Sequence, residues 1–279
     1  MKLLGSLTLG LLCCVGVVGT AHAQEDYTQQ EIDTAVEFAM HDAKYTMYHE
    51  IGHMLVGQLG LPVLGKEEDA ADALATILLL TDDNDEDSYN ALVDAADGWY
   101  FNAVNSTGST LEDLSYYDDH SLSIQRAYAM ACFMVGKDPE AFVDTAESYD
   151  FDADQQTACA GTYEQAFDAW ESVLEPHKVV DEQGAEIAIV YDDGGEEFGD
   201  FATILKGNRV LETAAELVMS RYVLPEPVTF RAGLCDEANA YYSPSNNEVI
   251  YCYELASQMT MLYLTDILPA VKEREAEEE

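Results

Sequence analysis

The chain has 279 residues, and its 54 Asp and Glu against 12 Lys and Arg give a formal net charge of −42 at pH 7. A surface this acidic excludes nucleic acid and anionic membranes as electrostatic partners, because both repel it. The excess of acid suggests a saline environment or a surface kept soluble by self-repulsion. A chain of this length can bury a sizeable hydrophobic core as one domain.

The N-terminus has the pattern of an export signal. One charge, Lys2, precedes an uncharged apolar run from Leu3 to about Val18, and small residues stand at both ends of Ala21-His22-Ala23. This pattern predicts a signal peptide over residues 1–23, with a mature chain that begins at Gln24. The apolar run is too short to span a membrane, and no later segment has the needed length. We therefore expect a bacterial protein exported to the periplasm or the extracellular space, with no membrane partner.

The first predicted helix carries the most informative motif of the chain. Thr28-Gln29-Gln30-Glu31 is typical of a capping box, and apolar residues recur at helical spacing from Ile32 to about Gly57. Near the end of this helix lies His49-Glu50-Ile51-Gly52-His53. Residues four apart share a helix face, so both imidazoles are expected to point at one place, with Glu50 beside them. The spacing H-E-x-x-H is that of a zinc site.

A catalytic zinc ion keeps three protein ligands, so the two histidines need a third partner. A second apolar helix is predicted from Glu67 to about Leu80, after a short turn that folds it back against the first. Glu68 opens this helix and is the best candidate for the third ligand. Asp72 follows one turn later and is expected to accept the second imidazole N–H of a ligand histidine. Glu67 has no acid four residues later, so we expect it to be a solvated acid of the first turn.

The paired motifs H-E-x-x-H and E-x-x-x-D resemble the gluzincin branch of zinc metallopeptidases, in which the glutamate is the third ligand and the aspartate supports the ligands. More closely, the chain resembles the bacterial DUF4344 family of "putative" metallopeptidases. The resemblance implies a zincin-like fold in which a small sheet lies beside the zinc helix. Its edge strand, expected here in the C-terminal hairpin, would receive an extended peptide. The segments that carry the resemblance are Tyr48–His53 with Pro62–Asp72, Asp119–His120 with Gln125–Arg126, Cys132, Gly136 and Asp138–Pro139, and Cys235 with Asn239–Tyr242 and Cys252–Leu255.

Two basic residues of the family-like segments are candidates for a contact with the substrate. Peptide hydrolysis needs a positive or N–H donor for the oxygen of the attacked carbonyl. His120 and Arg126 are the candidates, because basic groups are scarce in so acidic a chain. The alternative is that they form interhelical pairs with Asp118 or Asp119.

Removal of the signal peptide leaves four cysteines, an even number in an oxidising compartment. Cys235 and Cys252 flank a stretch with a turn-like centre that is typical of a β-hairpin, so a bond between them would fix the hairpin. Cys132 and Cys159 lie on two predicted helices. We therefore predict the disulfides Cys132–Cys159 and Cys235–Cys252. A cysteine metal site is disfavoured, because the chain has no C-x-x-C pair.

The pattern as a whole predicts an α+β fold in one metallopeptidase-like domain, residues 24–279. A mostly helical zinc-binding lobe, residues 24–178, is followed by a small α/β lobe, residues 179–279, whose sheet carries the disulfide-pinned hairpin. His41 and His177 have no motif around them, and we expect both at the surface. Beyond the zinc motifs, the predicted helices are 88–104, 120–135, 139–147, 154–174, 208–222 and 253–271, and the predicted strands are 186–191, 228–231 and the two strands of the hairpin 239–251.

These features together predict a secreted or periplasmic zinc metallopeptidase that acts on a peptide or protein substrate. The predicted ligands of Zn²⁺ are His49, His53 and Glu68, and Glu50 is the predicted general base that activates the zinc-bound water. The alternative is a catalytically inactive protein of zincin fold that binds peptide or metal. Glu50 favours the enzyme, because a pure binding protein would not need it.

Overall fold

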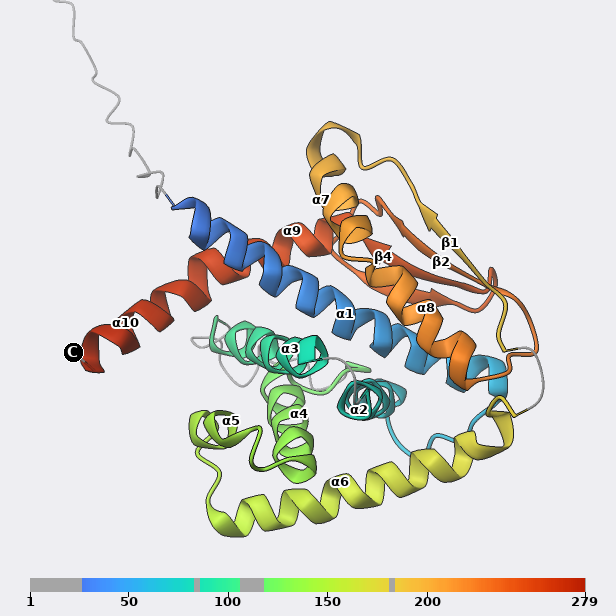
Figure 1. The fold of residues 1–279 in the computed structure, drawn as a ribbon, viewed down its shortest axis with the longest axis horizontal. Helices are drawn as coiled ribbons and strands as arrows, with labels where there is room; N and C mark the ends of the chain where they lie inside the picture. The colour runs from blue at the N-terminus through green and yellow to red at the C-terminus, as the bar shows by residue number, and fades with distance from the viewer. Residues whose placement is uncertain (1–26, 83–85, 106–117, 181–183, 279) are drawn as a thin grey trace, which may run out of the picture.

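The protein has the predicted α+β fold, in which a small mixed sheet lies among many helices. The structure, a computed structural model, describes residues 27–82, 86–105, 118–180 and 184–278, and the predicted signal peptide lies outside these residues. The elements are α1 (Gln29–Leu59), α2 (Glu67–Leu80), α3 (Glu86–Asn105), α4 (Ser123–Lys137), α5 (Val143–Ser148), α6 (Ala153–Leu174), η1 (Glu175–His177), β1 (Ile187–Tyr191), α7 (Gly195–Gly207), α8 (Val210–Arg221), β2 (Val228–Gly233), β3 (Ala240–Ser243), β4 (Glu248–Cys252), α9 (Tyr253–Leu262), η2 (Tyr263–Ile267) and α10 (Leu268–Glu278). Helix α1 runs diagonally through the molecule, between α2 to α6 on one side and the sheet with α7 and α8 on the other (Figure 1).

Helix α1 is fixed at both ends and buried along most of its second half. Thr28 and Glu31 form the predicted capping box, and Gly60 ends the helix at a φ of 61°, which glycine adopts without strain. From Phe38 to Val56 nearly every side chain is buried. This follows from its place in the fold, because α1 packs against α2 and α3 and also against α9, β3 and β4.

The four strands are ordered β1-β2-β4-β3, with parallel pairing except between β3 and β4. Alternation along β2 buries Val228, Phe230 and Ala232, and Phe230 is paired with the buried Val249 of β4. Helix α8 packs on β1 and β2 while α1 packs on β3 and β4, and the two helices contact each other. The edge strand β3 therefore lies beside the helix that carries the H-E-x-x-H motif.

Several element boundaries differ from the prediction. Helix α7 was not predicted, because four glycines between positions 194 and 207 lower the helix propensity of this segment. Helix α5 covers only the second half of the predicted helix 139–147. The last predicted helix is interrupted by the π-helical turn η2 before it continues as α10.

Both predicted cysteine pairs lie at disulfide-bond distance. The Sγ atoms of Cys132 and Cys159, on α4 and α6, are 2.01 Å apart, and those of Cys235 and Cys252 are 2.02 Å apart across the predicted hairpin. Disulfides are compatible with an exported protein. Among the helices of the described segments, none combines the length and the apolar character needed to cross a membrane.

The prediction of a surface position for His41 is wrong. His41 is 7% exposed, and its Nδ1 and Nε2 lie 2.5 and 2.9 Å from carboxylate oxygens of Asp94 and Asp87 on α3. Burial alone would lower the pKa of His41, but the hydrogen bonds to Asp87 and Asp94 raise that pKa to about 9. Lys44, one turn further along α1, also binds Asp87. Ion pairs of His41 and Lys44 with aspartates of α3 therefore connect α1 to α3.

The His41 cluster predicts a pH dependence of stability. Because the folded protein holds the His41 proton to a pKa of about 9 against 6.5 for an ordinary histidine, the stabilisation is complete below pH 6.5 and is lost as the pH rises through 9. The free energy of unfolding of the wild type, minus that of His41→Gln, should fall on the order of 2 kcal/mol between pH 6 and pH 10. Denaturant titrations at several pH values would measure it. A difference that stays constant over this range would contradict the assignment.

Candidate metal centre

The two motif histidines and Glu68 are brought together by the close contact of α1 with α2. Gly52, between the histidines, sits so near to α2 that a Cβ at this position would lie 3.0 Å from the Cα of Ala71. Such a distance is shorter than nearly all real Cβ contacts, so glycine lets the two helix backbones approach. The turn between the helices then directs the first turn of α2, with Glu67 and Glu68, at the histidine face of α1.

The candidate ligand atoms form a nearly equilateral triangle. The Nε2 atoms of His49 and His53 are 3.2 Å apart, and Oε2 of Glu68 lies 3.1 Å from the first and 3.2 Å from the second. In a tetrahedral zinc site with bonds of about 2.0–2.1 Å, neighbouring ligand atoms are separated by about 3.3 Å. The three atoms therefore have the spacing of one face of such a site, and these residues could hold a metal ion there.

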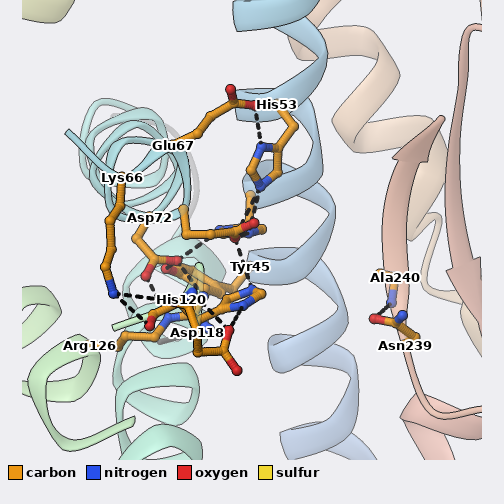
Figure 2. A network of polar contacts seen from close by, with 12 residues as sticks. Tyr45, His53, Lys66, Glu67, Asp72, Asp118, His120, Arg126, Asn239 and Ala240 are labelled. Atoms are coloured by element: carbon orange, nitrogen blue, oxygen red, sulfur yellow. Dashed lines mark hydrogen bonds and ion pairs between the residues drawn. The ribbon is translucent and has the colours of Figure 1, made fainter. Parts of the chain in front are cut away.

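Each motif histidine has a carboxylate at its other ring nitrogen. Nδ1 of His49 lies 2.8 Å from Oδ1 of Asp72, and Nδ1 of His53 lies 2.9 Å from Oε1 of Glu67. A carboxylate that accepts the Nδ1–H fixes the tautomer in which the Nε2 lone pair is free for a metal. The expectation for Glu67 is thus wrong in part, because this half-exposed acid reaches back from α2 to His53 (Figure 2).

Asp72 is the buried centre of a larger polar network. Arg126 on α4 donates from Nε and Nη2 to its two oxygens at 2.6 and 2.7 Å, and the Tyr45 hydroxyl donates to Oδ1 at 2.9 Å. The guanidinium also lies over the Trp99 ring, 3.6 Å from its centroid. Burial would raise the pKa of Asp72, but hydrogen bonds from His49 and Arg126 hold that pKa well below its usual range. Arg126 is therefore paired with Asp72 and not with Asp118 or Asp119.

His120 reaches the same cluster from the segment before α4. Its Nε2 lies 3.0 Å from Oε2 of Glu68. His49, Glu68 and His120 each have a possible metal-ligand atom within 4.8 Å of those of the other two. The backbone N–H of His120 donates to Asp118, and Lys66 donates to the carbonyl oxygens of Asp118 and His120 (Figure 2). His120 is half exposed, so it borders the metal-ligand group on its open side.

Glu50 faces a cavity of about 240 Å³ that is lined by residues of α1, α3 and α9 and by the start of strand β3. Glu50 is 6% exposed, and His120, Arg126 and Ala240 also line this cavity. Burial raises the pKa of Glu50, although the neighbouring His49 and His53 partly oppose the shift. The structure thus brings the motif glutamate and the edge strand of the sheet to one cavity.

Several residues of this site were not predicted from the sequence. Tyr45 stands four residues before His49, so the helical face that identified the histidines could also have identified it. Glu67 could have been found as an acid next to Glu68. No sequence signal pointed to Trp99 or Lys66, because their contacts join segments far apart in the chain.

Comparison with known proteins identifies the family. The sequence model of DUF4344, described as "Putative metallopeptidase", matches residues 11–174 and 193–277. A comparison with curated proteins and one with solved structures each gave no match. Since the matched residues cover most of the chain, the protein belongs to the DUF4344 family of metallopeptidases designated as putative.

Proposed function

We propose that the protein is an exported zinc-dependent metallopeptidase that hydrolyses peptide bonds. The observation that carries this proposal is the triangle of His49, His53 and Glu68 atoms with zinc-like spacing, next to the buried Glu50 in a cavity. The two disulfides and the signal-like N-terminus favour export.

A zinc ion held by these three residues would lower the pKa of its bound water and polarise the scissile carbonyl. Glu50 does not belong to the triangle but lies beside it, which suits a base that takes the water proton and passes it to the leaving amine. His120, on the open side of the ligand group, is suited to donate an N–H to the oxygen of the attacked carbonyl.

Arg126 has a different proposed role from the one suggested by its sequence context. Two of its nitrogens are used by Asp72, and it is 5% exposed. We therefore propose that Arg126 positions Asp72, which in turn orients His49. The buried Asp72 orients the ring of His49, and the half-exposed Glu67 orients the ring of His53 in the same way.

Strand β3 is the proposed docking edge for the substrate. It forms one edge of the sheet, and its residue Ala240 lines the cavity together with Glu50. An extended peptide added to this edge would make main-chain hydrogen bonds that do not depend on its sequence. Its scissile bond could then lie beside the ligand triangle.

The ligand assignment predicts the metal content of variants. Purified protein should hold about one zinc ion per chain, and Glu68→Ala should lose most of it because one of three ligands is removed. Glu67→Ala is the matched control, since its loss should only weaken zinc binding about 10- to 100-fold through the freed His53. Metal analysis after dialysis against a graded chelator would measure both. Retention in Glu68→Ala with loss in Glu67→Ala would reverse the assignment.

The base assignment predicts loss of activity without loss of metal. Glu50→Gln should lower the hydrolysis of an unbiased peptide library by about 10²- to 10⁴-fold, while zinc content and melting temperature stay near wild type. Glu37→Gln changes an exposed glutamate on the same helix and should leave the rate unchanged. If zinc-loaded wild type cleaves nothing and Glu50→Gln binds the same peptides equally well, the protein is a binding protein.

The position of His120 predicts a third outcome. His120→Ala should lower turnover about 100-fold by removal of the carbonyl donor, with zinc retained. His177→Ala, in η1, removes a histidine outside the site and serves as control. A fall in zinc affinity comparable to that of Glu68→Ala would show instead that His120 is a fourth ligand.

A further inference from the structure

The cavity beside Glu50 extends along α1 to a second acid. Asp42, Thr46 and Glu50 all line it, and they follow one another at intervals of four residues. Residues at this spacing share a helix face, and eight residues of helix rise about 12 Å. The cavity therefore extends from Glu50, the proposed catalytic base, to Asp42. A long side chain on the substrate residue next to the scissile bond would reach from one end of the cavity to the other.

Asp42 is buried, and the described residues place no cation in an ion pair with its carboxyl group. It is 8% exposed, and within the described part of the chain its Oδ2 has no hydrogen-bond partner. A hydrogen bond from Thr46 reaches the carboxylate, but burial and the charge of Asp94 raise the pKa of Asp42 to about 7. Arg126 also lines the cavity, yet it is bound to Asp72. A cation that enters the cavity would therefore meet a carboxyl group that forms no ion pair with the described residues.

The cavity walls suit a side chain that is apolar along its stem and charged at its end. Trp99, Leu255 and Met259 provide apolar surface, and the amides of Asn239 and Gln258 add polar groups. Lysine and arginine bury their methylene stems on such surfaces while the charged head finds a polar partner. Asn239, which borders the cavity, directly precedes the edge strand β3 (Figure 2).

We propose that this cavity is a specificity pocket for a lysine or arginine side chain of the substrate next to the scissile bond, with Asp42 as the residue that selects the charge. The proposal rests on the peptidase function proposed above and names its substrate class. The acidic surface of the chain would also attract basic peptides and speed their encounter.

A purely structural role for Asp42 makes a different prediction. The Tyr251 hydroxyl is also buried without a partner among the described residues, and burial together with the charge of Asp42 raises the pKa of Tyr251. A neutral Asp42 bridged to Tyr251 by water would join α1 to β4 without contacting the substrate. Replacement of Asp42 would then change stability and leave the choice of substrate unaltered.

The test compares peptides that differ only in charge at one residue. Once cleavage sites in a library are known, each position flanking the scissile bond is occupied in turn by arginine or by its uncharged isostere citrulline. Zinc-loaded wild type should prefer arginine at one position by about 10- to 100-fold in kcat/KM. Asp42→Asn should abolish this preference and keep the rate on the citrulline peptide within a few-fold.

Asp97→Asn is the matched control for the general effect of charge. Asp97 on α3 also has a pKa raised to about 7, by burial and the charge of Asp94, but it does not line the cavity. It should keep the preference for arginine. Equal loss of preference in both variants, or an Asp42→Asn variant that is only less stable, would overturn the pocket.

A binding measurement separates this proposal from the proposed function. Calorimetry on zinc-loaded Glu50→Gln protein should give tighter binding of the arginine peptide than of the citrulline peptide. In the double variant Glu50→Gln, Asp42→Asn, the two peptides should bind with equal affinity. If wild type cleaves peptides without a preference for arginine, the pocket fails and the peptidase stands. If nothing is cleaved but the binding difference is present, the peptidase fails and the pocket stands.

Discussion

The structure of the candidate site depends on one buried carboxylate. Asp72 on α2 contacts His49 and Tyr45 on α1 and Arg126 on α4, so three helices meet at two oxygen atoms. A charge at this depth would be strongly unfavourable alone, and it is tolerated because every contact is a donor or a cation. The arrangement restrains the ring of His49 and the start of α2. The position of Glu68 relative to the histidines therefore follows from it.

The acidic composition has a consequence inside the protein as well as on its surface. With only 12 lysines and arginines in the chain, the basic groups near the site are committed to specific tasks. Arg126 holds Asp72, Lys66 holds the segment of His120, and His41 with Lys44 joins α1 to α3. Asp42 is a carboxyl group in this region to which no such cation is assigned among the described residues, and the proposed pocket for a basic side chain is based on this difference.

Helix α1 connects these features because it belongs to two layers. It carries the histidine pair toward α2 and Glu50 with Asp42 toward the cavity that β3 borders. Helix α1 packs closely against α2 at Gly52 and also contacts the sheet. It can do both because its side chains are buried on more than one face. The candidate ligand group and the edge strand β3 are consequently both packed against the same helix, α1.

The sequence by itself determined the features that depend on local spacing. The capping box and helical periodicity predicted the helix of the motif, a four-residue interval placed both histidines on one face, and Glu68 and Asp72 followed from the same rule. The cysteine pairs could be predicted because each pair is close in sequence and borders one hairpin or one helix pair. Only the tertiary structure decided the strand order, the burial of His41, the contact of Glu67 with His53 and the pairing of Arg126 with Asp72. These features depend on which helix faces pack together across long stretches of chain. Hydrophobic periodicity predicts which face of a helix is apolar, but it does not predict which element packs against that face.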